Sequence, residues 1–158
     1  MVNPDVATLL DETWLTADMK PAARLRLATL GALAEIPAGT TIVREGEPCL
    51  TLAAVINGRV ALHMRVPGGA DRTILTVQSG DVVGWSAVLA QPIATSTAVA
   101  LVPTTAVEFD GGALRLAMAS DCELAAAVLE RLLVSVSRRL VATRVQLLDL
   151  YRAGSEPW

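Results

Sequence analysis

Apolar and polar positions follow a helical period at both ends of the chain and a shorter period between them. In the first third, the pattern predicts a helix capped by Asn3 with Pro4 as its first residue. A second helix follows, with Thr16 as a candidate cap and Pro21 as the point where it begins or kinks. Gly31 and then Pro37 mark where the helical pattern gives way. The apolar positions of this second helix are Leu25, Leu27, Leu30 and Leu33.

From Ile36 to Asp110 the chain is a series of short β-branched runs separated by turn residues. Two of these runs flank Asn57-Gly58, a pair that favours a tight β-hairpin because a type I′ turn needs positive φ at both positions. Strands this short and evenly spaced are typical of a β-sandwich or barrel.

Residues 82–107 carry no charged side chain, and this run is longer than the roughly 20 residues that span a bilayer. Pro92, Pro103 and several Ser and Thr residues interrupt it, however, so it predicts buried strands joined by turns. The N-terminus lacks the basic and apolar regions of a secretory signal. We therefore expect a soluble, cytoplasmic protein without membrane association.

The last third predicts a short helix around residues 113–118 and then a long one, capped by Ser120 or Asp121, that meets no breaker before Gly154. A second apolar stripe, made of Leu132, Val141, Val145 and Leu148, could pack on the β-domain. A further set of mostly apolar residues on the long helix is spaced alternately four and three residues apart. This spacing predicts the seam of a coiled coil, and hence a homodimer through this helix. The alternative is a single wide apolar face folded back on the chain's own core. The seam residues are Leu129, Leu133, Val136, Leu140, Thr143, Leu147 and Leu150.

The composition of the chain excludes several kinds of functional site. The chain has 158 residues, 53% of them apolar, and a formal net charge of −3, which fits one globular domain and excludes general electrostatic capture of nucleic acid. His63 is the single histidine, which excludes multi-histidine metal sites, and we expect it to be an ordinary strand residue. Cys49 and Cys122 lack metal or disulfide spacing. Because no metal site and no catalytic motif is present, we expect no enzyme activity.

Three stretches carry a resemblance to a known family: PAGTTIVREGE at 37–47, VINGRV at 55–60 and LTVQSGDVVG at 75–84. Together with the closing helix, they resemble the cyclic-nucleotide-binding domain, the effector domain of CRP/FNR-like regulators and of cyclic-nucleotide-gated kinases and channels. The resemblance implies a mainly β (α+β) fold, a jelly-roll-type β-roll with flanking helices, in a single domain over 1–158. Its parts would be N-terminal helices at 1–35, the β-roll at 36–110, C-terminal helices at 111–152 and a tail at 153–158.

The resemblance also implies a ligand site in the segment that corresponds to the family's phosphate-binding cassette, here called the cassette segment (residues 84–97). Where the family has a glutamate for the ribose, this chain has Trp85, and where it has an arginine for the phosphate, this chain has Ile93 or Ala94. A buried phosphate needs a charge-assisted partner. Arg65, Arg72 and Arg144 are candidates to supply one from elsewhere. Trp85 either fills the former pocket or stacks on a ligand. The expected ligand-binding residues are Gly84, Trp85, Ser86, Ala87, Thr95, Ser96 and Thr97.

We therefore predict a dimeric regulatory effector or sensor domain for signal transduction that binds a small molecule or a protein partner, but not cyclic nucleotide in the usual way. The tail at 153–158 is too short for a recognition helix, so we expect no DNA-binding domain and no direct DNA binding. One alternative is a genuine cyclic AMP or cyclic GMP sensor with a displaced phosphate ligand. The other is a ligand-free protein-interaction or scaffold module. Whether a cavity with a nearby guanidinium lies behind residues 84–97 discriminates between the two alternatives.

Overall fold

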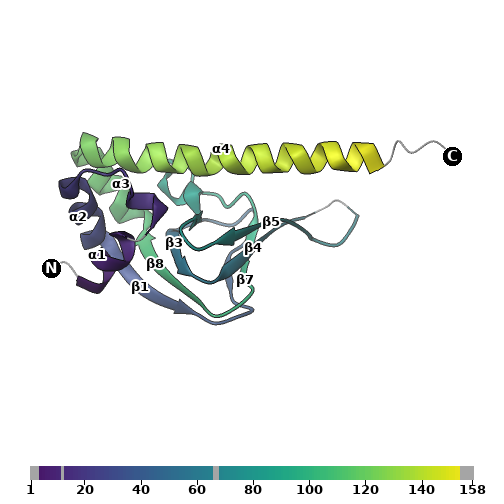
Figure 1. Cartoon of the computed structure of the whole chain (residues 1–158), viewed down its shortest axis with the longest axis horizontal. Coiled ribbons are helices and arrows are strands. Elements are labelled where there is room, and N and C mark those ends of the chain that lie inside the picture. Colours follow the sequence, from purple (N-terminus) through teal and green to yellow (C-terminus); the bar gives the residue numbers. More distant parts are fainter. Residues whose placement is uncertain (1–3, 12, 66–67, 154–158) are drawn as a thin grey trace.

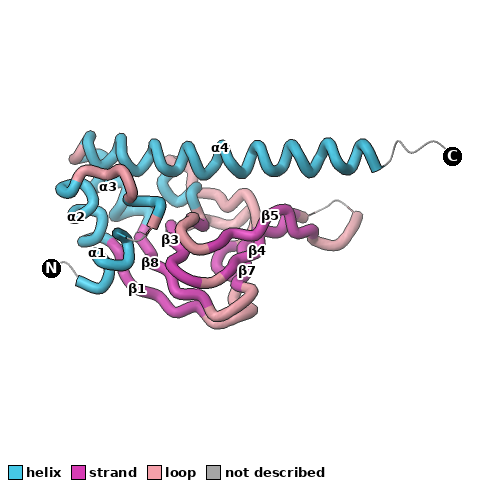
Figure 2. Tube along the Cα trace, in the orientation of Figure 1, coloured by secondary structure: helices cyan, strands magenta, loops and turns pink. Residues whose placement is uncertain are grey.

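The computed structural model describes the backbone of residues 4–11, 13–65 and 68–153, and the side chains of 6–11, 13–65 and 68–148. Figure 1 shows short helices gathered at one end of the molecule, strands in the middle, and the long helix α4 (Cys122–Ala153) lying along one side of both. The tube in Figure 2 shows the same division, with the strands confined to the body below α4. The mainly β fold with flanking helices is therefore confirmed.

The strands form two four-stranded antiparallel sheets. One has the order β1-β8-β3-β6, and the other has the order β2-β7-β4-β5. A small apolar core that includes Val55, Val60 and Val77 lies between the sheets, and a larger one that includes Phe109 and Leu114 joins the first sheet to the helices. The strands are β1 (Gly31–Ile36), β2 (Thr41–Val43), β3 (Thr51–Asn57), β4 (Arg59–Met64), β5 (Arg72–Gln78), β6 (Val82–Val83), β7 (Thr97–Ala100) and β8 (Thr104–Asp110).

Two N-terminal helices are confirmed, α1 (Pro4–Asp11) and α2 (Pro21–Leu30), with the short 3-10 helix η1 (Trp14–Thr16) between them. Asn3, the predicted cap of α1, lies outside the described residues. Of the two roles weighed for Pro21, it begins α2, where its missing N–H costs nothing. Thr16 as a cap for α2 was wrong, because its hydroxyl donates to the Leu10 carbonyl and so closes the turn after α1 instead.

The first strand begins at Gly31 rather than at Ile36, so the predicted boundary between helices and β-roll at residues 35 and 36 was wrong. All six residues of β1 pair with β8, from Gly31 opposite Phe109 to Ile36 opposite Thr104. A side chain at residue 31 would place its Cβ 2.6 Å from Val107 Cγ1, which is why glycine starts this strand. The apolar spacing that suggested a helix through Leu33 is overridden by this pairing.

Asn57-Gly58 does not make the predicted hairpin. The strands before and after it lie in different sheets, since β3 pairs with β8 and β6, and β4 pairs with β5 and β7. Only Gly58 has positive φ, at 123°, and a Cβ there would lie 2.3 Å from Thr104 Oγ1. The pair therefore carries the chain from one sheet to the other, and the hairpin of this region is β4–β5 instead.

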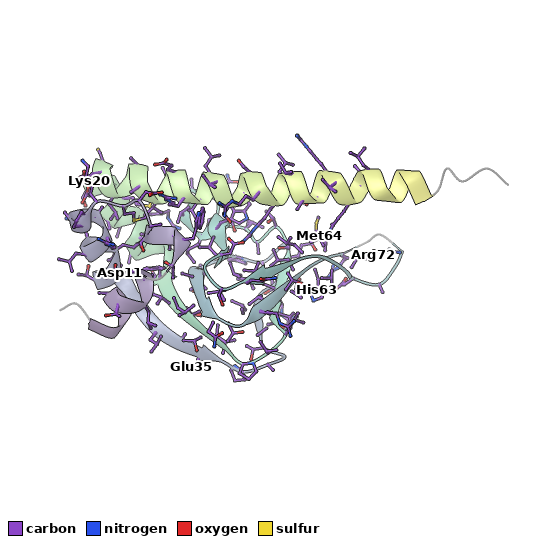
Figure 3. The ribbon with its side chains drawn as sticks, viewed as in Figure 1. Asp11, Lys20, Glu35, His63, Met64 and Arg72 are labelled. Atoms are coloured by element: carbon purple, nitrogen blue, oxygen red, sulfur yellow. The ribbon has the colours of Figure 1, made fainter. Side chains whose placement is uncertain are left out.

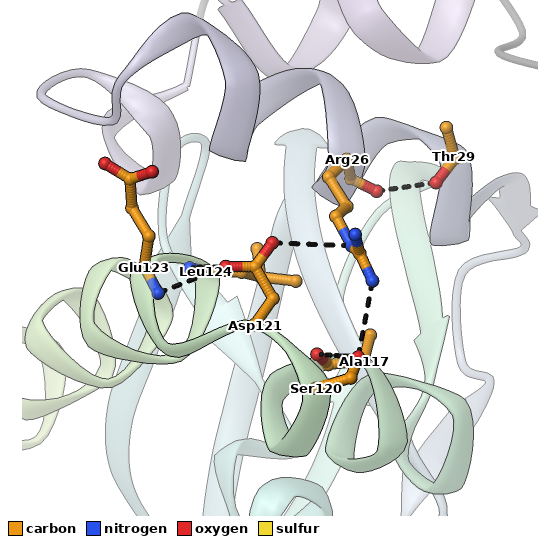
Figure 4. Close-up of polar contacts among 7 residues, drawn as sticks. All are labelled: Arg26, Thr29, Ala117, Ser120, Asp121, Glu123 and Leu124. Atoms are coloured by element: carbon orange, nitrogen blue, oxygen red, sulfur yellow. Dashed lines mark hydrogen bonds and ion pairs between the residues drawn. The ribbon is translucent and has the colours of Figure 1, made fainter.

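The helix α3 (Gly111–Ser120) leads into α4, and Asp121 caps α4 as one of the two predicted candidates. Asp121 Oδ1 accepts hydrogen bonds from the backbone N–H groups of Glu123 (3.1 Å) and Leu124 (3.0 Å). Figure 4 shows Arg26 of α2 reaching the same corner, 3.5 Å from Asp121 Oδ2 and 3.3 Å from the Ser120 hydroxyl. The start of α4 is thus fixed to the N-terminal helices.

One face of α4 packs on the body through Leu124, Val128, Leu132 and Ser135, which are all buried. Among the seam residues with described side chains, Leu129, Leu133, Leu140 and Leu147 are about half exposed or more, and Val136 is half-buried. Leu150 lies in α4, but its side chain is outside the described set. The second predicted stripe was wrong apart from Leu132, because Val141, Val145 and Leu148 are exposed and therefore do not pack on the body.

No helix within the described ranges is both long and apolar enough to cross a membrane. The uncharged run 82–107 forms β6, the 3-10 helix η2 (Trp85–Val88), β7 and the start of β8, as predicted from its turn residues.

Candidate functional site

The cassette segment starts at a glycine that no other residue can replace without strain. Gly84 has φ 76°, in the left-handed region, and a Cβ there would lie 2.2 Å from the Thr51 carbonyl oxygen. The buried Cys49 Sγ lies 3.5 Å from the Gly84 carbonyl oxygen, so this thiol packs under the turn. Gly84 therefore sets the direction in which η2, with Trp85 and Ser86, leaves the sheet.

Backbone hydrogen bonds fix the rest of the segment. Ala94 exchanges two of them with the loop after β2: its N–H donates to the Glu47 carbonyl, and its carbonyl accepts from Gly46, both at 2.9 Å. Arg115 of α3 donates to the Ala87 carbonyl. Held this way, Ala94 is buried and the Ile93 side chain is 46% exposed. The two positions that correspond to the family's arginine therefore bring no positive charge to the site.

Two hollows adjoin the cassette segment. The inner hollow lies against Gly84, Trp85 and Ser86, and its volume of about 10 Å³ holds about one water molecule. The outer pocket, of about 310 Å³, lies between the second sheet and α4. Most of its walls are apolar, and it is lined by Leu62, Met64, Ile74, Trp85, Thr95, Ser96, Val136, Arg139, Leu140 and Thr143.

Strand alternation decides which β4 side chains reach the outer pocket. Figure 3 shows Met64 on the side of the β4–β5 hairpin that faces α4 and His63 on the other side. His63 Nδ1 lies 3.0 Å from the Thr73 hydroxyl across the hairpin, which fits the expected ordinary strand histidine. Among the described side chains, no cluster of three or more His, Cys, Asp or Glu could hold a metal ion.

Arg139 of α4 is the functional candidate that sequence reasoning missed. It lines both hollows, and its side chain is 15% exposed. One guanidinium nitrogen, Nη2, donates to the Val82 carbonyl and lies 3.3 Å from Asp81 Oδ1. Its Nε is buried without a hydrogen-bond partner. The helical period carried the signal, because Arg139 follows Ser135 by four residues on the buried face of α4.

Asp81 connects the turn before the cassette segment to α4. Its Oδ1 accepts from the Ser135 hydroxyl at 2.7 Å and from the Val82 N–H at 2.8 Å, in addition to pairing with Arg139. The arginines proposed from sequence, Arg65, Arg72 and Arg144, line neither hollow. The guanidinium that lines both hollows is therefore already paired with a carboxylate.

The structure brings most of the predicted ligand residues together. Gly84, Trp85, Ser86, Thr95 and Ser96 all line the inner hollow, and three of them also line the outer pocket. The half-buried Trp85 forms a wall shared by the two hollows. Two predicted residues line neither hollow: Ala87 is fully buried, and the Thr97 hydroxyl accepts from the Glu45 N–H at 3.0 Å. Three predicted seam residues, Val136, Leu140 and Thr143, line the outer pocket as well.

Comparison with known proteins agrees with this architecture. The sequence profile of the family described as "Cyclic nucleotide-binding domain" matches residues 33–121. A CRP-like cAMP-activated global transcriptional regulator of Mycobacterium tuberculosis is 30% identical over 132 residues, which cover 84% of this chain and 57% of the regulator. The chain thus spans a little over half the length of that relative.

Solved structures show the same fold. A cyclic nucleotide-binding domain from Methylobacillus flagellatus matches with a TM-score of 0.78 and 21% identity, covering 92% of this chain and 82% of that one. A cAMP-binding acyltransferase from Mycobacterium smegmatis matches with a TM-score of 0.57 and 27% identity, covering 67% of this chain and 33% of the enzyme. The fold therefore occurs both in a cyclic nucleotide-binding domain and as part of a longer enzyme.

Proposed function

This chain belongs to the cyclic nucleotide-binding domain family, and from that premise we propose that it is a cytoplasmic, non-catalytic regulatory domain that senses a small ligand in the outer pocket. It relays the occupancy of that pocket through α4 to a second copy of the chain. It does not bind cyclic nucleotide in the way that the resemblance implies.

The wall chemistry of the inner hollow argues against the usual binding mode. Trp85 stands where a ribose-binding carboxylate is expected, and the buried Ala94 or the exposed Ile93 stands where a phosphate-binding guanidinium is expected. Each lost charge-assisted hydrogen bond costs about 1.5–3 kcal/mol, so two losses weaken binding by about two orders of magnitude or more. A hollow with room for about one water molecule leaves no space for a phosphate.

The outer pocket is the observation that carries the proposal. Its volume of about 310 Å³ lies at the lower end of the range of about 300–1,000 Å³ for small-molecule sites. Three of its lining residues, Val136, Leu140 and Thr143, are also seam residues. A ligand in the pocket therefore contacts the part of α4 that meets a partner helix, which gives occupancy a direct path to the dimer.

The exposed seam supports the dimer. Leu129, Leu133, Leu140 and Leu147 are each about half exposed or more, and they follow the heptad spacing along one side of α4. Leucines on a coiled-coil seam are buried when a second, two-fold-related helix packs against them. A dimer of this kind removes apolar surface from water and places the two outer pockets beside the same helix pair.

A second candidate function has its own supporting observation. The guanidinium of Arg139 lies beside the cassette segment, as a displaced phosphate ligand would require. In that case the protein is a genuine cyclic AMP or cyclic GMP sensor, and its ligand must compete with Asp81 for Arg139. The same guanidinium disfavours the ligand-free scaffold, for which no buried cation is needed.

Calorimetric titration of the full chain with cyclic AMP and, in parallel, cyclic GMP tests the proposal. We expect no heat of binding at millimolar nucleotide. Micromolar binding that is lost in Arg139→Ala and kept in Arg144→Ala, an exposed arginine farther along α4, would establish the second candidate instead. Sedimentation velocity over a concentration series tests the dimer, and a monomer at all concentrations would exclude relay through α4.

A further inference from the structure

Among the described side chains, a single ionisable one lines the outer pocket, and a carboxylate outside the lining neutralises it. Arg139 is the charged member of the lining, and Asp81 pairs with it from the turn before β6. We propose that the pocket selects an uncharged, mainly apolar ligand with one hydrogen-bond acceptor, and that Asp81 sets this selectivity by pairing with Arg139 and neutralising its charge. This inference rests on the proposed function and names the ligand class for the same site.

The paired charges lie close together and largely out of water. The Arg139 side chain is 15% exposed and that of Asp81 is 35% exposed, with Nη2 3.3 Å from Oδ1. Further hydrogen bonds fix the carboxylate, from the Ser135 hydroxyl and from the Val82 N–H. An anionic ligand would therefore enter a pocket without net positive charge, and it would lose its own hydration there without a free cation to replace it.

One donor of the Arg139 side chain has no acceptor. The Arg139 Nε–H is buried and lacks a partner, and such a donor costs free energy until an acceptor reaches it. A carbonyl, hydroxyl or ring-nitrogen acceptor on the ligand satisfies it, once Arg139 turns this N–H toward the pocket, without bringing in a charge. This unpaired N–H is the second observation, beside the cavity itself, that points to a ligand.

The remaining walls set the shape of the ligand. Leu62, Met64 and Ile74 form the strand side, and the indole of Trp85 adds an aromatic wall beside the cassette segment. Apolar ligands gain from the area that they bury here, and planar rings gain further from contact with the indole. A small aromatic molecule with a single hydroxyl or carbonyl fits this wall chemistry.

Two probes of the same size but different charge test the ligand class: 1-naphthol and 1-naphthyl phosphate, each titrated calorimetrically into the full chain. We expect wild-type protein to bind 1-naphthol at least about tenfold more tightly than the phosphate. Met64→Trp, which fills the pocket, should abolish 1-naphthol binding. The matched control is Leu116→Trp on α3, where the side chain is 75% exposed, and it should bind normally.

Asp81→Asn tests the selectivity residue. The amide oxygen still accepts from Ser135 and Val82, but the negative charge is gone, so the guanidinium is free to pair with a phosphate. We expect the affinity for 1-naphthyl phosphate to rise about tenfold and that for 1-naphthol to stay within about twofold. Asp18→Asn is the matched control, because Asp18 also pairs with an arginine of α4, Arg131, away from the pocket.

The outcomes separate this inference from the proposed function. Tighter binding of 1-naphthyl phosphate by wild-type protein overturns the ligand class but leaves the pocket as a site. An unchanged phosphate affinity in Asp81→Asn overturns the role of Asp81. If neither probe binds, or if Met64→Trp binds 1-naphthol as well as wild type does, the proposed pocket itself is refuted. The wild-type comparison of the two probes needs no variant, so it decides the ligand class even if Asp81→Asn fails to fold.

Discussion

Two adjacent leucines on α4 should respond to the same substitution in opposite ways. Leu132 is 5% exposed and packs on the body, whereas Leu133 is 67% exposed and belongs to the seam. Truncating Leu132 to alanine opens a cavity in the chain's own core, so it should lower the free energy of unfolding by about 2–4 kcal/mol. The substitution is the same at both positions, so a difference between the two effects on stability depends only on what each side chain contacts.

Leu133→Ala should leave the folding of a single chain almost unchanged, because only a third of the side chain is buried there and alanine favours helix. In the dimer, each copy loses the two-thirds of the side chain that the partner would cover, out of about 2 kcal/mol for full burial. The pair of copies therefore loses nearly 3 kcal/mol, and the dimer dissociation constant should rise about a hundredfold.

Urea unfolding at protein concentrations below dimer dissociation measures the first effect, and sedimentation velocity over a concentration series measures the second. Unfolding must be compared at fixed protein concentration, because dimerisation itself stabilises the folded chain. The reasoning fails if Leu133→Ala destabilises the dilute chain as much as Leu132→Ala does. It also fails if Leu133→Ala leaves the dissociation constant where it was.

Three further predictions concern the body. Gly84→Ala should cost more stability than Gly39→Ala, because both have positive φ but only Gly84 faces a blocking atom, with a 2.2 Å approach to the Thr51 carbonyl; urea midpoints of the two variants measure the difference. Trp14→Leu should lower the free energy of unfolding by about 1–2 kcal/mol more than the loss of buried area alone explains. The Trp14 ring centroid lies 4.8 Å from the Arg138 guanidinium carbon and 5.7 Å from that of Arg131. Thermal unfolding of this variant and of Trp14→Phe, which keeps an aromatic face, tests the prediction. The hydrogen bond and the charge of Glu123 raise the pKa of Lys20 above its ordinary 10.5, so the stabilisation from this pair is present at neutral pH and lost as pH rises through the raised pKa; NMR titration of the lysine should show the pKa fall in Glu123→Gln, and an unchanged pKa would refute the pairing.

The order of helices and strands could be predicted because local patterns decide it. Pro21 begins α2 and Asp121 caps α4, and both signals act within one helical turn. Asn57-Gly58 was misread for the same reason: the pair favours a hairpin locally, but the chain there passes between two sheets whose strands pair with distant segments. A local turn signal does not specify which strands its flanks will join.

The site was predictable only in part. Trp85, Thr95 and Ser96 could be found because they lie in the segment that resembles the family's cassette, and the loss of its two charged residues was visible in the sequence. Arg139 could not be found in this way, because it lies more than 40 residues farther along and meets the pocket only when α4 packs on the body. The volume of each hollow likewise depends on packing between elements.

The exposed part of α4 makes the order of the helix itself measurable. From Val141 to Leu148 no side chain is buried, and the helix continues to Ala153. A helical segment of this length is marginal in water without a partner to pack against. Amide hydrogen exchange in this segment should therefore be fast in the isolated chain and slow once a second helix covers it. The exchange rate of each amide along this segment therefore reports the fraction of chains whose α4 is packed against a second helix.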